Sequence, residues 1–411
     1  MSASWKKILY STCIAQFIAM LGFGFVFPFM AFYIHDLGVP AGPEADKWTG
    51  ILVMAMGVPM AICSPIWGWV ADRHGRKSMV LRAMFGGAVT VLLMAFVQNV
   101  HQLLILRILQ GILTGTITAS MALVASATPL EHAGYALGMV TVSASGGNFM
   151  GPLLGGYAAK FIGYRATFVV AAAILLVGAF VVMYGTEEKF ERHEASRTGM
   201  TRAFLPLLAI GSFLVPLLTL WLINFAASMP APTFPYFVQS ISAMSDKDAA
   251  ALTGIIIAVV GPVETASAWI FGRFGDRWGH KRVLMAAVIW GGIMCGLHAY
   301  ARTIPQLIAC RILFALGMAA IFPTASAIIR KVVPEHSLGK AFGLVASLCS
   351  LGWGFGPLAG AYFSAYMRDY RPTFLLSGIA LCVVSLFIAW RVKEPAAADE
   401  SDLTSAPSVE P

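Results

Sequence analysis

The amino-acid sequence predicts an all-α membrane protein in which twelve transmembrane helices form two pseudo-symmetric six-helix bundles. Three observations lead to this fold class: a very apolar composition, twelve apolar stretches of membrane-spanning length, and an internal duplication. Of the 411 residues, 58% are hydrophobic and only 12% are charged, about half the charged share of an ordinary soluble domain. So few charges cannot cover the wet surface of a soluble enzyme, and so many apolar residues exclude a disordered chain.

Each of the twelve apolar stretches contains about the 20 residues that a helix needs to cross a bilayer. Gly and Pro inside many of them are more typical of membrane helices than of soluble core helices. The chain lacks the period-two alternation that the strands of a membrane barrel require. The predicted spans are approximately 8–34, 48–71, 78–98, 102–125, 135–160, 165–185, 204–228, 250–273, 282–300, 305–329, 339–364 and 371–390.

The distribution of basic residues predicts the orientation. Nineteen of the 28 Lys and Arg residues lie in the tails and the even-numbered junctions between spans, whereas seven lie in the odd-numbered junctions. By the positive-inside rule, both termini of this multi-pass protein face the cytoplasm from the inner (plasma) membrane. The net charge of +8 is therefore a signal of topology and gives no indication of nucleic-acid binding.

The polar segments divide the chain. We expect an N-terminal six-helix bundle over 1–185, a cytoplasmic linker over 186–203, a C-terminal six-helix bundle over 204–392, and a disordered cytoplasmic tail over 393–411. The six cysteines are scattered within the spans at no disulfide or metal spacing.

An internal duplication relates the two bundles. A shift of about 204 residues aligns many distinctive groups, and an even number of spans per repeat gives both halves the same orientation. Such a parallel repeat predicts a site between the halves, near the midplane of the membrane. Examples are Arg107-Ile108-Leu109 with Arg311-Ile312-Leu313, and Glu131-His132 with Glu335-His336.

A conspicuous charged motif joins the second and third spans. Gly68 is followed by Asp72-Arg73, Gly75 and Arg76. This pattern predicts the end of one helix, a tight turn and the start of the next helix. The basic residues surrounding Asp72 allow an ionic latch, although a cytoplasmic anchor with a glycine turn is the simpler alternative.

Together with the twelve spans and the duplication, this motif resembles the signature loop of the major facilitator superfamily over residues ~5–392. The resemblance implies that superfamily's fold, with a loop that latches the halves on the cytoplasmic side and is released during transport. Asp72 and Arg76 would carry the latch. The second copy has Asp276 but carries His280 in place of Arg76, so it is partly degraded.

A second motif places Arg107 inside the fourth span, ahead of Gln110-Gly111. A charge there is costly unless it is paired or hydrated, and the alternative is an arginine that snorkels to the outer interface. The segment resembles the motif of proton-linked exporters whose arginine is tied to proton movement, which implies proton coupling for Arg107. Arg311 lacks the following Gln-Gly, and we expect it to be structural.

The fifth span carries a glycine pattern. Glycines that recur every four residues share one helix face and let another helix approach closely, while a proline bends the helix. The pattern resembles the antiporter motif of drug:proton exporters, which favours export over uptake; generic helix packing is the alternative. The motif comprises Gly138, Gly147, Gly151, Pro152, Gly155 and Gly156.

One carboxylate is placed unlike the others. Nineteen of the twenty acidic residues fall in loops, tails or helix ends, but Glu264 lies 12 residues before Asp276, about 18 Å inside at the helical rise. An intramembrane acid of this kind is suited to taking up and releasing a proton. A static structural acid is the alternative.

Several other polar and aromatic residues are candidates for lining a substrate cavity. Asn148 lies at a depth similar to that of Glu264, and the superfamily's packing of spans five and eight implies that the two are neighbours. The further candidates are Gln16, Asn224, Trp269 and Trp353.

The sequence thus predicts a proton-coupled secondary transporter that exports small amphipathic compounds by alternating access. An exporter of one metabolite, such as a sugar or amino-acid derivative, is the alternative. We expect no enzymatic activity and no cofactor, with the proton gradient as the energy source. The expected partners are a small-molecule substrate, protons and the lipid bilayer, with no nucleic acid, and the expected state is a monomer.

Overall fold

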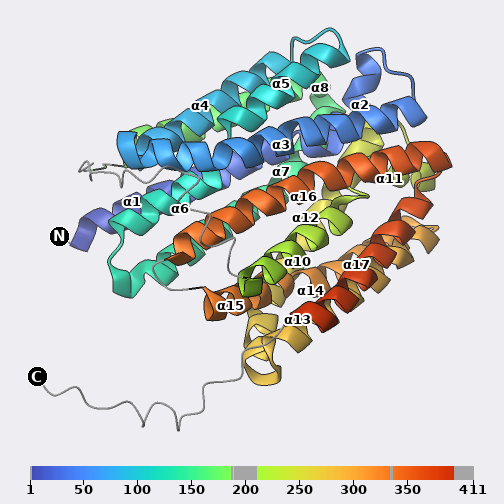
Figure 1. Ribbon diagram of the computed structural model, residues 1–411. Coiled ribbons are helices and arrows are strands. Elements are labelled where there is room, and N and C mark those ends of the chain that lie inside the picture. The colour runs from blue at the N-terminus through green and yellow to red at the C-terminus, as the bar shows by residue number, and fades with distance from the viewer. Residues whose placement is uncertain (1, 187, 189–210, 334–336, 393–411) are drawn as a thin grey trace, which may run out of the picture.

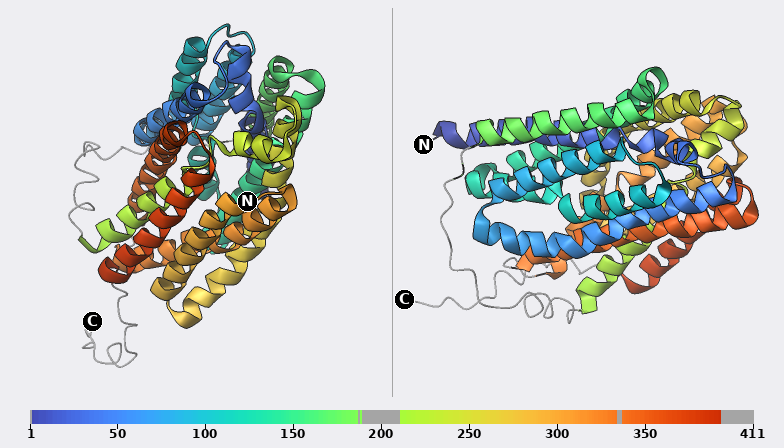
Figure 2. Two further views of the ribbon diagram at one scale, coloured as in Figure 1. Left: turned by 90° about the vertical axis from the view of Figure 1, so that its right-hand side faces the viewer. Right: turned by 90° about the horizontal axis from the view of Figure 1, so that it is seen from above.

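The computed structural model describes residues 2–186, 188, 211–333 and 337–392, and within these ranges it contains helices and no strand. Most of the predicted linker and the whole of the predicted tail lie outside the described residues. The helices form two bundles whose long axes run side by side (Figures 1 and 2).

The N-terminal half contains eight α-helices over its six predicted spans. Their bounds are α1 (Ser2–Gly24), α2 (Phe27–Asp36), α3 (Pro43–His74), α4 (Arg76–Met94), α5 (Val100–Leu113), α6 (Thr116–Ala127), α7 (Ala133–Ile162) and α8 (Tyr164–Gly185).

The described part of the C-terminal half repeats this order. Its α-helices are α10 (Gly211–Ser228), α11 (Phe234–Ser242), α12 (Asp246–Trp278), α13 (His280–Leu297), α14 (Ile304–Met318), α15 (Ile321–Val332), α16 (Leu338–Met367) and α17 (Arg371–Arg391).

Eleven helical segments of the described chain are long and apolar enough to cross a membrane. The span predicted over 135–160 is not among them, although α7 covers it with 30 residues. Its glycines and polar residues, such as Asn148, lower the apolar content without shortening the helix. The length of α7 and its packing between α1 and α12 still place it among the spanning helices.

Three predicted spans, 8–34, 102–125 and 305–329, are broken in two, which corrects their prediction as continuous helices, and α11 adds a short helix beyond the predicted span 204–228. The breaks separate α1 from α2, α5 from α6, α10 from α11, and α14 from α15. The first and third breaks, and the second and fourth, lie about 204 residues apart, so the duplication preserves them. One break is fixed locally by Gly115, whose φ of 111° favours glycine. Irregular backbone at membrane depth is tolerated only inside protein or beside a cavity.

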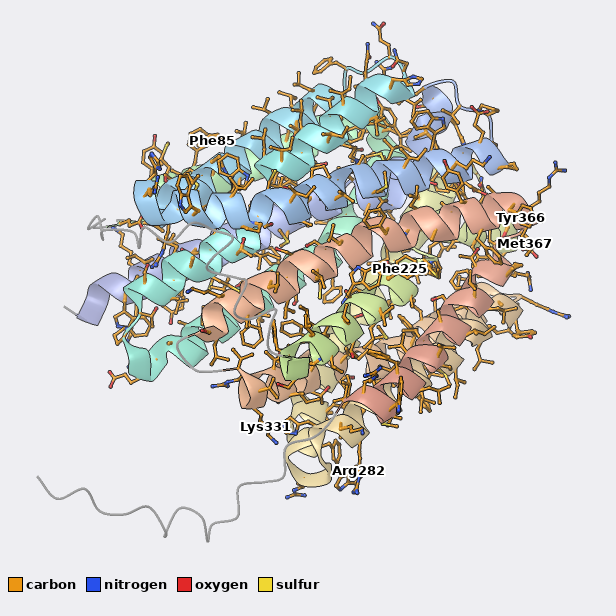
Figure 3. All side chains as sticks on the ribbon, in the orientation of Figure 1. Phe85, Phe225, Arg282, Lys331, Tyr366 and Met367 are labelled. Carbon is orange, nitrogen blue, oxygen red and sulfur yellow. The ribbon has the colours of Figure 1, made fainter. Side chains whose placement is uncertain are left out.

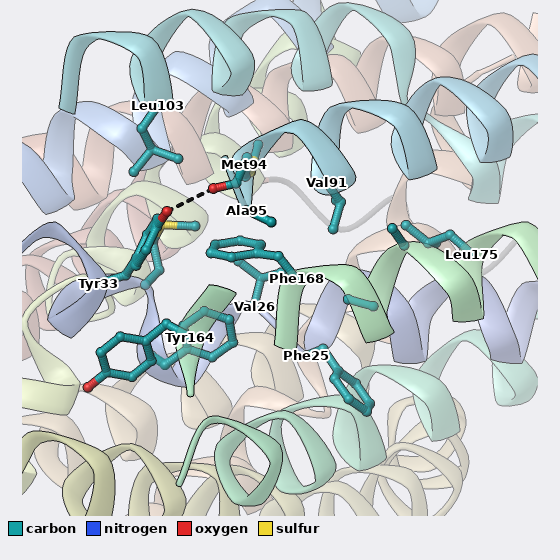
Figure 4. Packing of buried hydrophobic residues seen from close by; sticks show 14 of the residues in the cluster. Phe25, Val26, Tyr33, Val91, Met94, Ala95, Leu103, Tyr164, Phe168 and Leu175 are labelled. Carbon is teal, nitrogen blue, oxygen red and sulfur yellow. Dashed lines mark hydrogen bonds between the residues drawn. The ribbon is translucent and has the colours of Figure 1, made fainter. Parts of the chain in front are cut away.

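Each half has an apolar core of its own. In the N-terminal half, the rings of Tyr33 and Phe168 pack edge to face at 5.0 Å, and Tyr33 Oη donates to the Met94 carbonyl at 2.8 Å (Figure 4). In the C-terminal half, Phe237 and Phe374 pack at 4.8 Å. Two separate cores allow each half to move as a unit.

The labelled side chains define the ends of the C-terminal half. Arg282 and Lys331 lie at one end, and Tyr366 and Met367 lie at the other (Figure 3). We call the end with Tyr366 and Met367, which lies away from the N-terminus, the outer end; the opposite end is the inner end.

The glycine face of α7 packs against α1 of the same half. A Cβ atom at Gly147 or Gly151 would lie 2.2 or 2.6 Å from a backbone oxygen of α1, and one at Gly155 would lie 2.1 Å from the oxygen of Phe25, just after α1. The corresponding residues of α16 pack in the same way on α10. Three glycines of the antiporter pattern therefore join helices within one half by backbone contact, whereas the Pro152 carbonyl and Gly156 of the same pattern face α12 of the other half.

Two long helix pairs make most of the contact between the halves, namely α3 with α16 and α7 with α12, and α2 adds contacts with α11 and α12. At the first interface, a Cβ at Gly57 would lie 2.9 Å from Gly354. At the second, a Cβ at Gly254 would lie 2.2 Å from the Pro152 carbonyl. The halves therefore touch through residues without side-chain bulk.

Replacing Gly155 tests the packing of α7 on α1. Gly155→Val would force the new side chain into the Phe25 carbonyl, so we expect a loss of monodisperse protein and a melting temperature lower by several degrees. Thermal unfolding followed by size-exclusion chromatography measures both. Gly138→Ala is the matched control, since its Cβ meets no described atom within 4 Å and alanine favours the helix. Equal effects of the two substitutions would contradict this packing.

Candidate transport site

Polar contacts close the halves onto each other at the outer end. His35 Nδ1 lies 3.1 Å from Asp246 Oδ2, and Lys160 Nζ lies 2.9 Å from Asp248 Oδ1. The Tyr236 hydroxyl also donates to the backbone carbonyl of Ala31. Each of these contacts pairs a residue of one half with a residue of the other, so the outer side is shut.

Toward the inner end the same interfaces separate. Gly68 lies eleven residues beyond Gly57 on α3, and Gly343 lies eleven residues before Gly354 on α16, which is about three helical turns along the same face. At Gly57 and Gly354 the helices touch, whereas a Cβ at Gly68 or Gly343 would meet no described atom within 4 Å. The same holds on α7, where Gly138 lies eleven residues before Phe149. The Phe149 ring packs on Gly261 of α12, whereas a Cβ at Gly138 would meet no described atom within 4 Å. In the part of the chain that the structure describes, the halves therefore meet at the outer end and lie apart at the inner end.

Glu264 lies at the point where α7 and α12 begin to diverge. It follows Gly261, whose Cβ would meet the Phe149 ring, by three residues on the same side of α12. Its side chain is partly buried, and its charged neighbour is Arg311 on α14, with which it interacts electrostatically. Among the described residues no direct salt bridge joins the two.

Arg311, for which the sequence predicts a structural role, is thus the charged neighbour of Glu264. Its guanidinium lies 4.9 Å from the Phe234 ring centre and 5.6 Å from that of Phe314. These faces supply cation–π attraction that helps to hold the charge inside the bundle. The Gln-Gly that follows Arg107 is absent after Arg311, so that motif gave no signal for this role.

Arg107 occupies the equivalent place in the N-terminal half. It is 9% exposed, so it is buried and does not snorkel. Its Nη1 donates to Gln110 Oε1 at 3.0 Å and contacts Met56 Sδ at 3.4 Å, while Nε has no partner. The duplication places Met60 where the other half has Glu264. Among the described residues, no carboxylate forms a salt bridge with Arg107.

Asn148 and Trp353 occupy equivalent positions on the walls between the halves. Asn148 lies between Gly147, which packs on α1, and Phe149, which packs toward α12. Trp353 lies between Gly352, which packs on α10, and Gly354, which packs toward α3. Both side chains are exposed. Because successive residues of a helix are turned by about 100°, each of these side chains points between the directions of its two neighbours in the chain. Asn148 and Glu264 thus lie on the two helices of the α7–α12 pair, and no hydrogen bond joins them in the described structure, so their proximity stays a prediction.

The other cavity candidates are placed differently. Gln16 is fully buried between α1 and α6, where Ser120 Oγ donates to it at 2.9 Å and Thr116 Oγ1 accepts from it at 3.4 Å. This position makes it a link inside the N-terminal bundle. Asn224 Nδ2 donates to the Leu220 carbonyl at 2.8 Å on its own helix and faces α16. The side chain of Trp269 lies outside the described part.

The charged loop has a partner that the motif does not contain. Gly75, at φ 90°, separates α3 from α4, and Arg73 lies 3.7 Å from the Trp69 ring centre. The backbone amides of Arg76 and Lys77 each donate to the Glu188 carboxylate at 2.8 Å. Glu188 therefore caps the start of α4 from the segment after α8.

The predicted latch itself stays a prediction. The side chains of Asp72 and Asp276 lie outside the described residues. Arg76, the other predicted member, is described through its backbone bond to Glu188. A carboxylate from outside the motif was not signalled by sequence, because the cap forms only when the segment after α8 returns to α4.

Two helical bundles of parallel repeat, with a charged site where they diverge, have the architecture of a secondary transporter. The family model of the Major Facilitator Superfamily matches residues 12–268 and 249–408. The chain belongs to this superfamily.

Curated relatives match nearly the full length of the chain. It is 31% identical over 391 residues to the multidrug resistance protein MdtG of Dickeya zeae (strain Ech586), covering 94% of each chain. It is 28% identical over 389 residues to the multi-drug resistance efflux pump PmrA of Streptococcus pneumoniae (TIGR4), covering 93% of this chain and 96% of PmrA. These relatives are transporters and not enzymes, and they indicate a multi-pass plasma-membrane protein.

Solved structures support the same fold. The nucleoside transporter NupG matches with a TM-score of 0.75 at 15% identity, covering 94% of this chain and 99% of that one. A bacterial homologue of the human lysosomal transporter Spinster, in an inward-facing and occupied conformation, matches with a TM-score of 0.75 at 13% identity, covering 95% and 97%. At these identities the likeness concerns the fold alone.

The pairing of Glu264 with Arg311 can be measured by a double-mutant cycle. We expect the effects of Glu264→Gln and Arg311→Gln on the free energy of unfolding to be coupled by about 1 kcal/mol or more. The reason is that each substitution removes the charge with which the other residue interacts. The matched control combines Glu264→Gln with Arg107→Gln, which lies in the other half and should give additive effects within about 0.5 kcal/mol. Additivity in the first cycle would show that the two charges are independent.

The Glu188 cap predicts local protection of α4. Removing the carboxylate with Glu188→Ala should weaken the start of this helix by about 1 kcal/mol. Hydrogen exchange at the amides of Arg76 and Lys77 should then become several-fold faster. Glu131→Ala removes an acid that is 77% exposed and should leave these amides unchanged. Unchanged exchange in Glu188→Ala would mean that the cap contributes nothing.

Proposed function

We propose that this protein exports small amphipathic compounds, including unrelated toxic ones, in exchange for protons. Its full-length similarity to MdtG and PmrA, which are named multidrug efflux proteins, supports this substrate class. The predicted orientation, with both termini in the cytoplasm, would make the inner end the cytoplasmic one. Substrates would then enter from the cytoplasm in the inward-open arrangement described above.

The observation that carries the proposal is the position of Glu264. A carboxylate at the edge of the diverging halves, with a positive neighbour on α14, can exchange its proton as the site changes sides. In the inward-open state, the deprotonated group would attract a substrate with positive charge. After the halves rock, protonation from outside would weaken this attraction and release the substrate.

Arg311 and Arg107 have different parts in this proposal. Arg311 would stabilise the deprotonated form of Glu264 when no substrate is bound, so that the site stays charged and ready. Arg107 has no acidic partner in the described structure. Its positive charge would disfavour proton binding in the N-terminal half by electrostatic repulsion. Proton binding would therefore concentrate at the α7–α12 side of the cavity.

The walls of the site suit substrates of mixed character. Trp353 offers an aromatic surface, and the equivalent Asn148 offers an amide, so one side of the cavity is apolar and the other can hydrogen-bond. We propose that the protein works as a monomer without a cofactor and takes its energy from the proton gradient. The apolar and polar walls would hold varied compounds without strict geometry.

Transport in proteoliposomes with an imposed pH gradient tests the function. We expect the wild type to move several unrelated lipophilic cations against their gradient when the proton gradient is present. Glu264→Gln should reduce this proton-driven transport at least tenfold, because the amide cannot exchange a proton, with normal insertion into the membrane. Glu44→Gln replaces an exposed acid at the outer end and is the control.

Two results would contradict the proposal. Proton-driven export that survives in Glu264→Gln, with its pH dependence intact, would remove Glu264 from the coupling. Transport of one metabolite but none of the lipophilic cations would instead favour a dedicated metabolite exporter.

A further inference from the structure

A second buried carboxyl group lies at the outer end, where the halves close on each other. Asp46 belongs to the first turns of α3 and is 3% exposed. In the sequence it is one of the nineteen acids that lie in loops, tails or helix ends. Its burial was not visible there, because α16 of the other half covers it.

The contacts of Asp46 suit a protonated carboxyl group better than a carboxylate. Ser364 Oγ donates to Oδ2 at 3.3 Å, and Oδ1 has no hydrogen-bond partner. No salt bridge in the described part of the chain includes Asp46. A buried carboxylate with one unsatisfied oxygen and no cation carries a large desolvation cost, which its neutral form largely avoids.

Among the described residues, no positively charged group forms a salt bridge with the Asp46 carboxyl group. Ser364 belongs to the last turn of α16, where the helix dipole is negative and disfavours an anion. This opposes the favourable dipole at the start of α3. Two phenols interact with Asp46, namely Tyr236 of α11 and Tyr370 before α17. On α3 itself, Glu44 and Lys47 are exposed, and the Lys47 ammonium lies over the Tyr362 ring of α16. The histidine nearby is His35 of α2, which is paired with Asp246 of α12.

The duplication shows that the fold does not require an acid at this position. The shifts that align the halves place Ala250 of α12 at the position of Asp46, and Ala159 of α7 at the position of Ser364. Both alanines are fully buried. The equivalent interface therefore packs with two methyl groups where this one has a carboxyl group and a hydroxyl.

We propose that Asp46 is a second proton-binding site. It belongs to the outer gate, by which we mean the contacts that join the two halves at the outer end. The gate closes with the carboxyl group protonated; when the halves separate at the outer end, the O–H proton passes to external water and leaves a hydrated carboxylate. This inference rests on the proposed function, because alternating access is what opens the gate. External protons thereby favour the return of an emptied exporter to the inward-open state.

The sign and size of the effect follow from linkage. The closed gate holds one proton more than the open gate, so raising the pH favours opening and lowering it favours closure. For one proton, the ratio of closed to open molecules changes by up to about tenfold per pH unit.

Distances between spin labels across the gate test the proposal. Labels at Glu44→Cys and Tyr366→Cys, in a full-length protein without its six native cysteines, report the separation of α3 and α16. Glu264→Gln is included so that this acid cannot contribute to the pH dependence. With Asp46 present, we expect the short-distance fraction to fall as the pH rises, by up to about tenfold in the closed-to-open ratio per unit.

Substitutions at Asp46 decide the outcome. Asp46→Asn keeps the shape but cannot ionise, and Asp46→Ala copies the equivalent alanine of the other interface. Both should give the short distance at every pH. Asp248→Asn, which removes a 40% exposed acid of the same gate, should retain the pH dependence.

Three results would overturn the proposal. The first is a pH dependence that both Asp46 variants retain, and the second is a pH dependence that is lost in Asp248→Asn as well as in the Asp46 variants. The third is a short distance at every pH in the protein that keeps Asp46. The export assay on the same preparation, with Glu264 restored, separates this from the proposed function. A gate that responds to pH through Asp46 in a protein that exports no lipophilic cation would contradict export and leave the gate site standing.

Discussion

Close contact between helix backbones is the constraint on which the rest of this structure depends. In lipid no hydrophobic force drives helices together, so packing must come from surfaces that fit closely. Gly151 brings α7 onto the backbone of α1, and Gly356 does the same for α16 on α10. Because these contacts hold each half together, the halves can separate along α3–α16 and α7–α12 without loss of either core.

The site arises where the two repeats have diverged from each other. Arg107 and Arg311 are equivalent and both lie inside the bundles, yet only Arg311 has an acidic neighbour in the described structure, since Met60 stands where the other half has Glu264. The outer gate shows a similar asymmetry, with Asp46 opposite a serine where the other interface has two alanines. The two repeats thus keep the same arrangement of helices but differ in the charges that they place inside the bundles.

The charges also explain why this conformation is closed on one side only. His35–Asp246 and Lys160–Asp248 span the halves at the outer end, while the glycines at the inner end of the same interfaces meet no described atom. Residues without side chains allow the helices to meet there as well, once the halves rock. The four broken helices keep their breaks at equivalent positions in both repeats, so local bending is available to each half.

The sequence by itself determined the twelve spans, the duplication, the superfamily and the unusual position of Glu264, because membrane burial requires long apolar segments and makes any internal charge conspicuous. The glycine period of α7 likewise predicted a close helix contact, though not that α1 is the partner. The tertiary structure decided which groups meet. The packing of α14 on α12 brings Arg311 within electrostatic range of Glu264. Gln16 forms its hydrogen bonds within its own bundle, and Asp46 is buried by α16, about 320 residues away. Such contacts join segments that are distant in the chain, so no local pattern of residues could reveal them.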